Sequence, residues 1–264
     1  MLDIVKKLVN DCSNKNFLLE KNVQYNPLQE YIELVENNSK KYDKIECAKI
    51  LIAIIVEYLN YEESLQTIEK THEAQNNSLI EEIYSKLMRN LELNNYTTAI
   101  EEVHPNDVKH YNNVQLLNRK PIETPIDTFP ILLNPWNEDR ILYNFIIIND
   151  KNEFDGITYS GNIDNHYLHP MGIVVCNRGN HSQLSGRYRN RGITVIKEIK
   201  DFSSLYGKVK FNGYDYIKVD DNTTIEIDCN HNILFYSGVI FELGRYLKNY
   251  CAIKEIQDIL KKNK

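Results

Sequence analysis

The chain has 264 residues, a formal net charge of −6 and a sequence pI near 5.7. A chain of this length forms one large domain or two small ones, and it can bury a core without disulfides or metals. Its hydrophobic fraction of 42% excludes an intrinsically disordered chain. The acidic balance argues against a protein that coats nucleic acid non-specifically, because such binding needs Lys and Arg to neutralise phosphates.

Cysteine usage and the lack of long apolar runs predict a cytoplasmic protein. The five cysteines are scattered, odd in number and form no CxxC pair, which favours reduced thiols over a disulfide framework. The most apolar run, residues 50–56, is far too short to span a bilayer, and residues 1–8 do not resemble a signal peptide. We therefore expect no membrane contact. Heavy use of Asn, Lys, Ile and Tyr indicates A/T-rich codons and suggests a bacterial or phage origin.

Residues 1–103 are predicted to be a helical region. Asn26-Pro27 is a favourable helix start, since Asn can cap a helix and Pro suits its first position. A second helix is expected from residue 43 to about residue 59, and a further short one over residues 62–73. Such apolar stripes usually form core, but a helical module that binds a protein partner is the alternative. A last stripe has four-residue spacing and consists of Leu79, Ile83, Leu87 and Leu91.

Residues 104–264 are predicted to form a mixed α/β domain. Pro, Gly and β-branched residues become commoner after His104-Pro105, and residues 156–170 are polar enough to suggest a long loop. The fold class is therefore α+β, with a helical N-terminal region, a mixed α/β domain, a small antiparallel β extension and a C-terminal helix. The expected strands lie at residues 172–176, 193–199, 209–211, 214–219 and 223–227.

A basic segment containing Gly follows the strand predicted at residues 172–176. From Asn177 to Arg191 there are four Arg and no acid, although the whole chain is acidic. Gly179 would let the backbone approach an anion, a following helix would direct free N–H groups at it, and Arg matches phosphate oxygens. The alternative is a solvated Arg-rich face beside an ordinary turn. The phosphate-binding box predicted at residues 177–183 offers Arg178, Gly179, Asn180, Ser182 and Gln183.

The order of short motifs between residues 122 and 199 resembles a divergent ParB/sulfiredoxin-like domain. The matching pieces are Pro125-Ile126-Asp127, Asn134-Pro135 with Arg140, residues 169–175, Gly179-Asn180-His181-Ser182 and Gly192-Ile193-Thr194-Val195. The resemblance implies a nucleotide-binding fold whose box contacts phosphates, and some ParB-like relatives hydrolyse nucleotides or cut DNA. It adds Asn134 and Arg140 to the expected binding residues. Ser182 stands where that family has its final box Arg.

His181 is the predicted catalytic residue. Nearby Arg side chains disfavour its protonation, so a neutral imidazole could act as a base or donate a hydrogen bond to phosphate. The expected ligand is a nucleotide or another phosphate-bearing molecule. A nucleotide hydrolase or nuclease would use a nucleoside triphosphate or nucleic acid with Mg²⁺. No metal-ligand spacing occurs in the sequence, so no protein metal site is predicted.

Two other functions remain open from the sequence. One is a non-enzymatic interaction protein built on a degenerate ParB-like scaffold, which the missing final box Arg favours. The other is recognition of nucleic acid through the Arg178–Arg191 cluster, with Arg187, Arg189 and Arg191 as candidate contacts. The acidic overall charge makes nucleic acid the weaker of the two.

Overall fold

The computed structural model describes residues 26–70, 76–94, 96–102 and 114–262. No helix in these ranges is long and apolar enough to cross a membrane. The helices there are α2 (Pro27–Asn38), α3 (Lys44–Glu69), α4 (Leu79–Asn90), α5 (Glu138–Ile147), α6 (Asn180–Arg189), α7 (His231–Gly244) and α8 (Lys254–Lys262). Short 3-10 helices occur at η2 (Ser160–Asn162), η3 (Ser203–Gly207) and η4 (Arg245–Leu247).

The strands form three sheets. The largest has the order β2 (Val114–Asn118), β1 (Tyr96–Glu101), β9 (Glu198–Asp201), β6 (Asp164–His169), β7 (Ile173–Arg178) and β4 (Ile131–Leu132). The second has the order β3 (Ile122–Pro125), β8 (Gly192–Ile196) and β5 (Phe154–Asp155), and the third has the order β10 (Val209–Phe211), β11 (Tyr216–Lys218) and β12 (Thr224–Ile225). β6 pairs antiparallel with β7 and parallel with β9. The α+β class, the antiparallel extension and the C-terminal helix are confirmed, but the strand predicted at 193–199 divides into β8 and β9.

α3 is one continuous helix, although the sequence pattern suggested a break after residue 59. No Gly or Pro interrupts the helix, so the polar residues near its middle do not end it. One of them, Asn60, is fully buried and links the helix to the β4 segment. Its Nδ2 donates to the Ile131 carbonyl at 2.8 Å, and its Oδ1 accepts from the Leu133 amide at 2.8 Å. The polar residue therefore serves packing against the sheet.

The prediction of a loop over residues 156–170 is wrong for residues 164–169, which form the central strand β6. The sequence of β6 is polar, yet every residue from Asn165 to His169 is buried. Asn165 donates hydrogen bonds to Thr194 Oγ1 at 2.9 Å and to the Val195 carbonyl at 2.8 Å. Because such partners come from distant parts of the chain, the composition of the segment could not reveal that its polar groups are satisfied in the interior.

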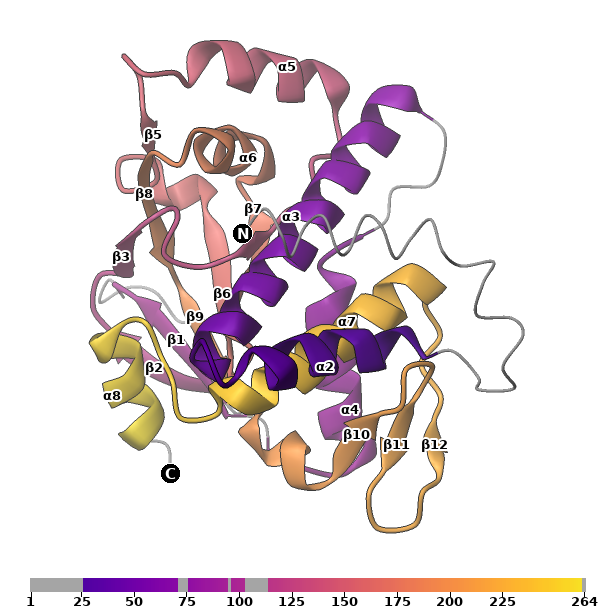
Figure 1. Cartoon of the computed structure of the whole chain (residues 1–264). Helices are drawn as coiled ribbons and strands as arrows, with labels where there is room; N and C mark the ends of the chain where they lie inside the picture. Colours follow the sequence, from indigo (N-terminus) through magenta and orange to yellow (C-terminus); the bar gives the residue numbers. More distant parts are fainter. Residues whose placement is uncertain (1–25, 71–75, 95, 103–113, 263–264) are drawn as a thin grey trace.

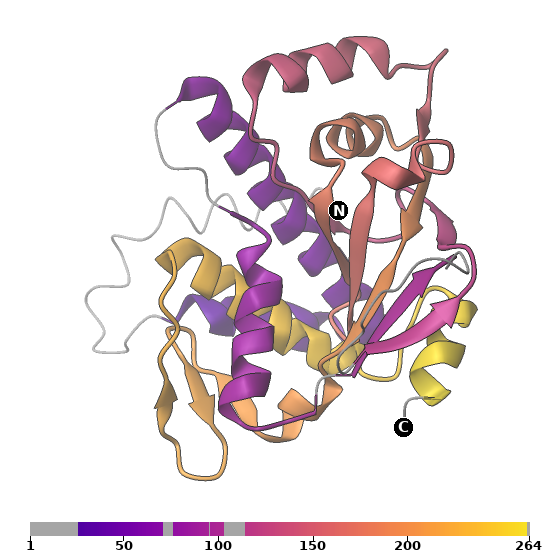
Figure 2. The same cartoon turned by 180° about the vertical axis from the view of Figure 1, so that it is seen from behind.

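Two hydrophobic clusters lie on opposite faces of the six-stranded sheet. Leu168 belongs to one and Tyr167 to the other, as the alternation of side chains along a strand requires. Helices α2, α3, α4 and α7 contribute to the first cluster, and α5, α6 and α8 to the second. Figure 1 shows α3 crossing in front of the sheet, and Figure 2 shows the strands from behind. The N-terminal helices thus share a core with the part predicted at 104–264, and β1, from the region predicted as helical, joins its sheet.

Candidate phosphate-binding site

The box is a sharp turn between a buried strand and a helix. β7 ends at Arg178, and α6 begins at Asn180. Gly179 between them has a φ of +94°, and a Cβ there would lie 2.5 Å from Cδ1 of Ile163. Gly is therefore needed both for the backbone conformation and for the close approach. Gly179 occupies the N-cap position of α6 and has no side chain. It therefore cannot accept a hydrogen bond from the first N–H groups of the helix through a side chain.

Three helix starts meet beside the box. Asn77, just before α4, donates its backbone N–H to Oδ1 of Asn134 at 2.6 Å. Asn134, which precedes α5, donates its own N–H to Oδ1 of Asn180 in α6 at 2.8 Å. Its side-chain amide also donates to Oδ1 of Asn76 at 2.8 Å. The segments that precede α4 and α5 therefore meet the start of α6, and α6 alone of the three helices has no acid in its first turn.

His181 is a nearly buried imidazole held by the loop before α5. Its Nε2 accepts a hydrogen bond from the Asn137 backbone N–H at 3.2 Å, so the neutral ring is assigned its proton on Nδ1. Burial lowers the pKa of His181 below its usual range, and the positive charge of Arg140 lowers it further. The ring is therefore neutral at pH 7. With Nε2 occupied, the arrangement favours His181 as a hydrogen-bond donor through Nδ1 over a role as base.

Trp136 adds an exposed aromatic face to this surface. Its side chain is 60% exposed, and its ring meets the ring of His181 edge-on at a centroid distance of 5.4 Å. The Arg140 guanidinium lies over the indole at 5.2 Å. Asn137 caps α5 by accepting from the Arg140 N–H at 2.9 Å, which fixes the start of that helix. A flat aromatic and a cation beside three helix starts suit a ligand that carries both a ring and a negative charge. Trp136 is the only Trp in the chain, but it is not among the site residues expected from the sequence.

The remaining box residues differ in how far they reach solvent. The side chain of Arg178 is 69% exposed and its Nε lies 3.8 Å from Asp164 Oδ2. Ser182 directs its hydroxyl at the Gly179 carbonyl at 3.1 Å. Gln183 is fully buried and donates to Asn165 Oδ1 at 3.0 Å, so in this structure it supports the box from below. Its predicted contact with phosphate therefore does not fit the geometry, because its amide satisfies the polar interior of β6.

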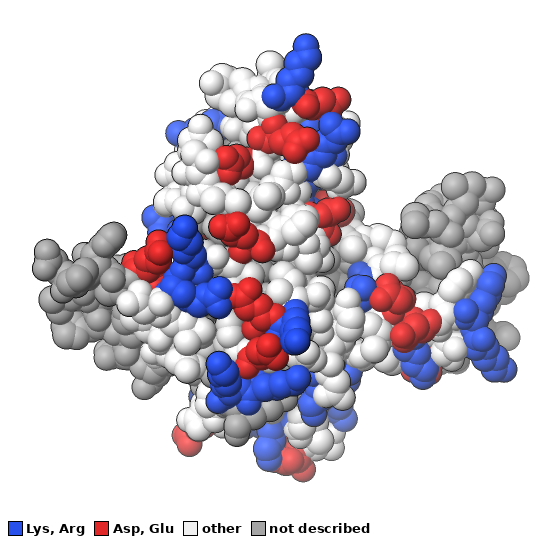
Figure 3. Space-filling view, turned by 90° about the vertical axis from the view of Figure 1, so that its left-hand side faces the viewer, with Lys and Arg blue, Asp and Glu red and all other residues white. Residues whose placement is uncertain are grey.

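The downstream Arg side chains do not form one basic surface. Arg187 donates to two backbone carbonyls and pairs with Glu57, and its side chain is only 10% exposed. Arg189 donates to two carbonyls at the end of α5. Arg191 is half-exposed and lies 3.4 Å from Asp150. On the face shown in Figure 3, Lys and Arg alternate with Asp and Glu. Of these side chains, Arg187 and Arg189 therefore hold backbone carbonyls in place, and Arg191 lies at the surface.

A second polar cluster, which we call the His166 network, lies on β6 and β9 under α4. His166 Nδ1 is 3.0 Å from Glu81 Oε2. Its Nε2 is 3.6 Å from both Asp164 Oδ1 and Glu198 Oε2. Lys200 contacts Glu81 and lies 3.4 Å from Glu198 Oε2. The expectation that His166 lies in a loop is wrong: it is 8% exposed in a central strand, between groups from three elements.

The His166 network is a set of paired charges. Burial alone would lower the pKa of His166, but the neighbouring carboxylates of Asp164 and Glu81 outweigh burial and raise the value to about 9. Burial would likewise raise the pKa of Glu81, but the hydrogen bond to His166 and the charges of His166 and Lys200 together outweigh burial and lower the pKa. At neutral pH the imidazole is therefore cationic and the carboxylates are ionised. The sequence offered one signal, the polar residues at two-residue spacing in β6 and β9.

The network adjoins the box through two consecutive residues. The Asn177 side-chain amide lies 3.0 Å from Nδ1 of His166. Because a cationic ring has only N–H donors, the amide oxygen of Asn177 is the atom that should face it. The next residue, Arg178, has its Nε 3.8 Å from Asp164 Oδ2.

No group of three or more His, Cys, Asp or Glu side chains among the residues that the structure describes is arranged to hold a metal ion.

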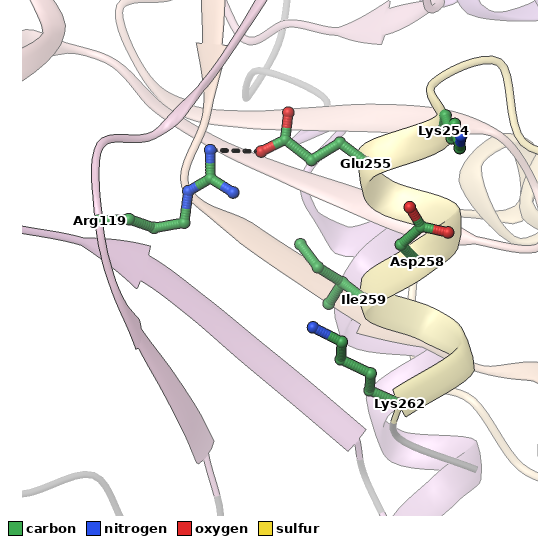
Figure 4. A pocket seen from close by; sticks show the side chains of 6 residues that line it. All are labelled: Arg119, Lys254, Glu255, Asp258, Ile259 and Lys262. Atoms are coloured by element: carbon green, nitrogen blue, oxygen red, sulfur yellow. Dashed lines mark ion pairs between the residues drawn. The ribbon is translucent and has the colours of Figure 1, made fainter.

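One open depression lies away from the box. It is lined by Arg119 and by Lys254, Glu255, Asp258, Ile259 and Lys262 of α8 (Figure 4). Arg119 and Glu255 form an ion pair at 2.5 Å across it. The lining carries both signs of charge and shares no residue with the box or the His166 network.

Comparison with known proteins gives a family but no activity. A model described as a family of unknown function (DUF6710) matches residues 12–254. The chain belongs to the DUF6710 family. The box and the His166 network both lie within the matched part of this DUF6710 chain. No curated protein and no solved structure matches it. The resemblance of this DUF6710 protein to ParB/sulfiredoxin-like domains therefore stays a prediction.

Proposed function

We propose that this protein binds a nucleotide, or another phosphate-bearing ligand, at the surface formed by the box and the loop before α5. The observation that carries the proposal is the convergence of three helix starts through Asn77, Asn134 and Asn180. The start of α6 has neither a capping side chain nor an acid in its first turn, so it is the position best suited to a phosphate. A ParB-like fold for residues 122–199 belongs to the same proposal.

Each part of the surface has a role in this proposal. The phosphate accepts from the first N–H groups of α6, and the exposed guanidinium groups of Arg178 and Arg140 supply positive charge. His181 donates from Nδ1, because its Nε2 is occupied by the Asn137 amide. The ring of the nucleotide stacks on the exposed face of Trp136. A hydrolase would in addition need Mg²⁺ brought with the nucleotide, since the start of α6 is free of acids.

The test is thermal unfolding of the whole chain with each common nucleoside triphosphate, with and without Mg²⁺. A ligand at one hundred times its dissociation constant adds about 2.7 kcal/mol of stability, which raises Tm by roughly 5–10 °C in a chain of this size. We expect Arg178→Ala and Arg140→Ala to weaken binding at least tenfold. Arg191→Ala is the matched control, because Arg191 is exposed and lies outside the box. No Tm shift with any nucleotide would refute nucleotide binding at this surface.

The same samples separate binding from catalysis. Release of inorganic phosphate by the wild type, lost in His181→Ala, would extend the function to nucleotide hydrolysis. Binding without release would limit it to a nucleotide-binding protein. Recognition of nucleic acid through Arg187 and Arg189 is the less favoured function, because both guanidinium groups donate to backbone carbonyls. Exposed apolar side chains along α3 favour a protein-interaction role for the helical region.

A further inference from the structure

An apolar stripe runs along the outer face of α3. Its members recur at intervals of three or four residues, which places them on one side of the helix. They are Ile50, Ile54, Tyr58, Tyr61, Leu65 and Ile68, with exposures of 43%, 41%, 44%, 43%, 56% and 44%. The opposite side of α3 is buried in the core. Figure 1 shows α3 crossing the front of the molecule.

This stripe is larger than isolated surface apolar residues would produce. Large side chains present about 200 Å² each when free, so six that are roughly half-exposed leave on the order of 500 Å² of contiguous apolar surface. Patches of that size mark interaction sites on soluble proteins.

The order of side chains in the stripe reads nearly the same in both directions. From one end it runs Ile, Ile, Tyr, Tyr, Leu, Ile, and from the other end Ile, Leu, Tyr, Tyr, Ile, Ile. An antiparallel copy of the same helix therefore places aliphatic residues opposite aliphatic residues and Tyr opposite Tyr. We propose that this stripe is the interface of a two-fold symmetric dimer in which two α3 helices pack antiparallel.

The proposed register follows from that order. Ile54 faces the partner's Leu65, and Tyr58 faces the partner's Tyr61. At the ends, Ile50 faces the partner's Ile68. The two-fold axis passes between Tyr58 and Tyr61, near the middle of a helix that is about 39 Å long at 1.5 Å per residue.

The exposed area fits a second copy of this chain. The stripe contributes on the order of 500 Å² per protomer, so two copies together bury about 1,000 Å², the least that a specific interface requires.

The experiment is the mass of the full chain in solution, measured by size-exclusion chromatography with light scattering at tens of micromolar protein. The wild type is expected at twice the monomer mass of 31.0 kDa. Ile54→Lys alone and Leu65→Glu alone should each weaken the dimer at least tenfold and give monomers. The double variant should restore the dimer, because each Lys then faces a Glu of the partner. Ile146→Lys on α5, where Ile146 is 73% exposed, is the matched control and should stay dimeric.

Each other outcome overturns part or all of the proposal. A monomeric wild type at this concentration overturns the dimer. A dimer that survives both single substitutions overturns the stripe as its interface. Single variants that are monomeric without rescue in the double variant overturn the antiparallel register, since a parallel pair would set Lys against Lys and Glu against Glu. Circular dichroism of each variant confirms that the exposed substitutions leave the fold intact.

Discussion

Replacing His166 with Gln tests the charge balance of the His166 network. The fold raises the pKa of His166 from 6.5 to about 9. At about 1.4 kcal/mol per pKa unit, the native state prefers the protonated ring over the neutral one by about 3 kcal/mol. The side chain is only 11% exposed, so solvent screening removes little of this. We expect His166→Gln to lower the free energy of unfolding by about 3 kcal/mol at pH 6, because Glu81 and Asp164 lose their shared cation.

The pH dependence of that difference is the sharper part of the prediction. Because the folded pKa is raised above the unfolded value, the stabilisation is fully present below about pH 6.5 and is lost as pH rises through about 9. The difference between wild type and His166→Gln should therefore shrink toward pH 10.

Urea unfolding at pH 6, 8 and 10 measures this difference. His231→Gln is the matched control, because His231 is exposed at the start of α7, and it should change stability by less than about 0.5 kcal/mol. A difference below about 1 kcal/mol at pH 6 for His166→Gln, or one that is equal at pH 6 and pH 10, would refute the reasoning.

Three further substitutions test how the site is supported. Arg187→Met removes a nearly buried guanidinium from its carbonyl acceptors and from Glu57, and chemical denaturation should show a loss of about 3 kcal/mol. Asn60→Leu leaves a carbonyl and an amide of the β4 segment unpaired, so unfolding experiments should give a loss of about 2–4 kcal/mol, with faster hydrogen exchange at Leu133. Gly179→Ala forces a side chain into a left-handed residue against Ile163, and we expect a loss of about 1–3 kcal/mol together with weaker nucleotide binding; unchanged stability would contradict the geometry of the turn.

The position of the box could be predicted because its signals are local. The short apolar run at residues 172–176 indicates a buried strand, and Gly179 shortly after it indicates a sharp turn into a helix. The N-cap of α2 could also be predicted, since the Asn26 side chain accepts from the Leu28 backbone N–H only two residues away. The direction of the His181 pKa was also anticipated, but not its cause: burial has the largest effect, and the nearby cation is Arg140 rather than an Arg of the box.

The expectations that the structure contradicts share one physical origin. A loop was predicted for β6 because its residues are polar, and Arg187 was grouped with a basic surface because it is near other Arg in sequence. In both cases the polar groups are satisfied by partners from distant segments, such as Glu57 for Arg187. Burial of a polar side chain depends on those partners, and a linear pattern does not contain them.

Elements that depend on neighbouring residues could be predicted from the sequence alone: helix starts, the apolar strand β7, the glycine turn and the acid-free start of α6. Which of these elements meet depends on the three-dimensional fold. It brought the starts of α4, α5 and α6 together through Asn134. It also placed His166 among carboxylates from α4, β6 and β9 and left an apolar stripe of α3 partly exposed. Backbone preferences act over a few residues, whereas charge pairing and burial act between segments that only the folded chain brings into contact.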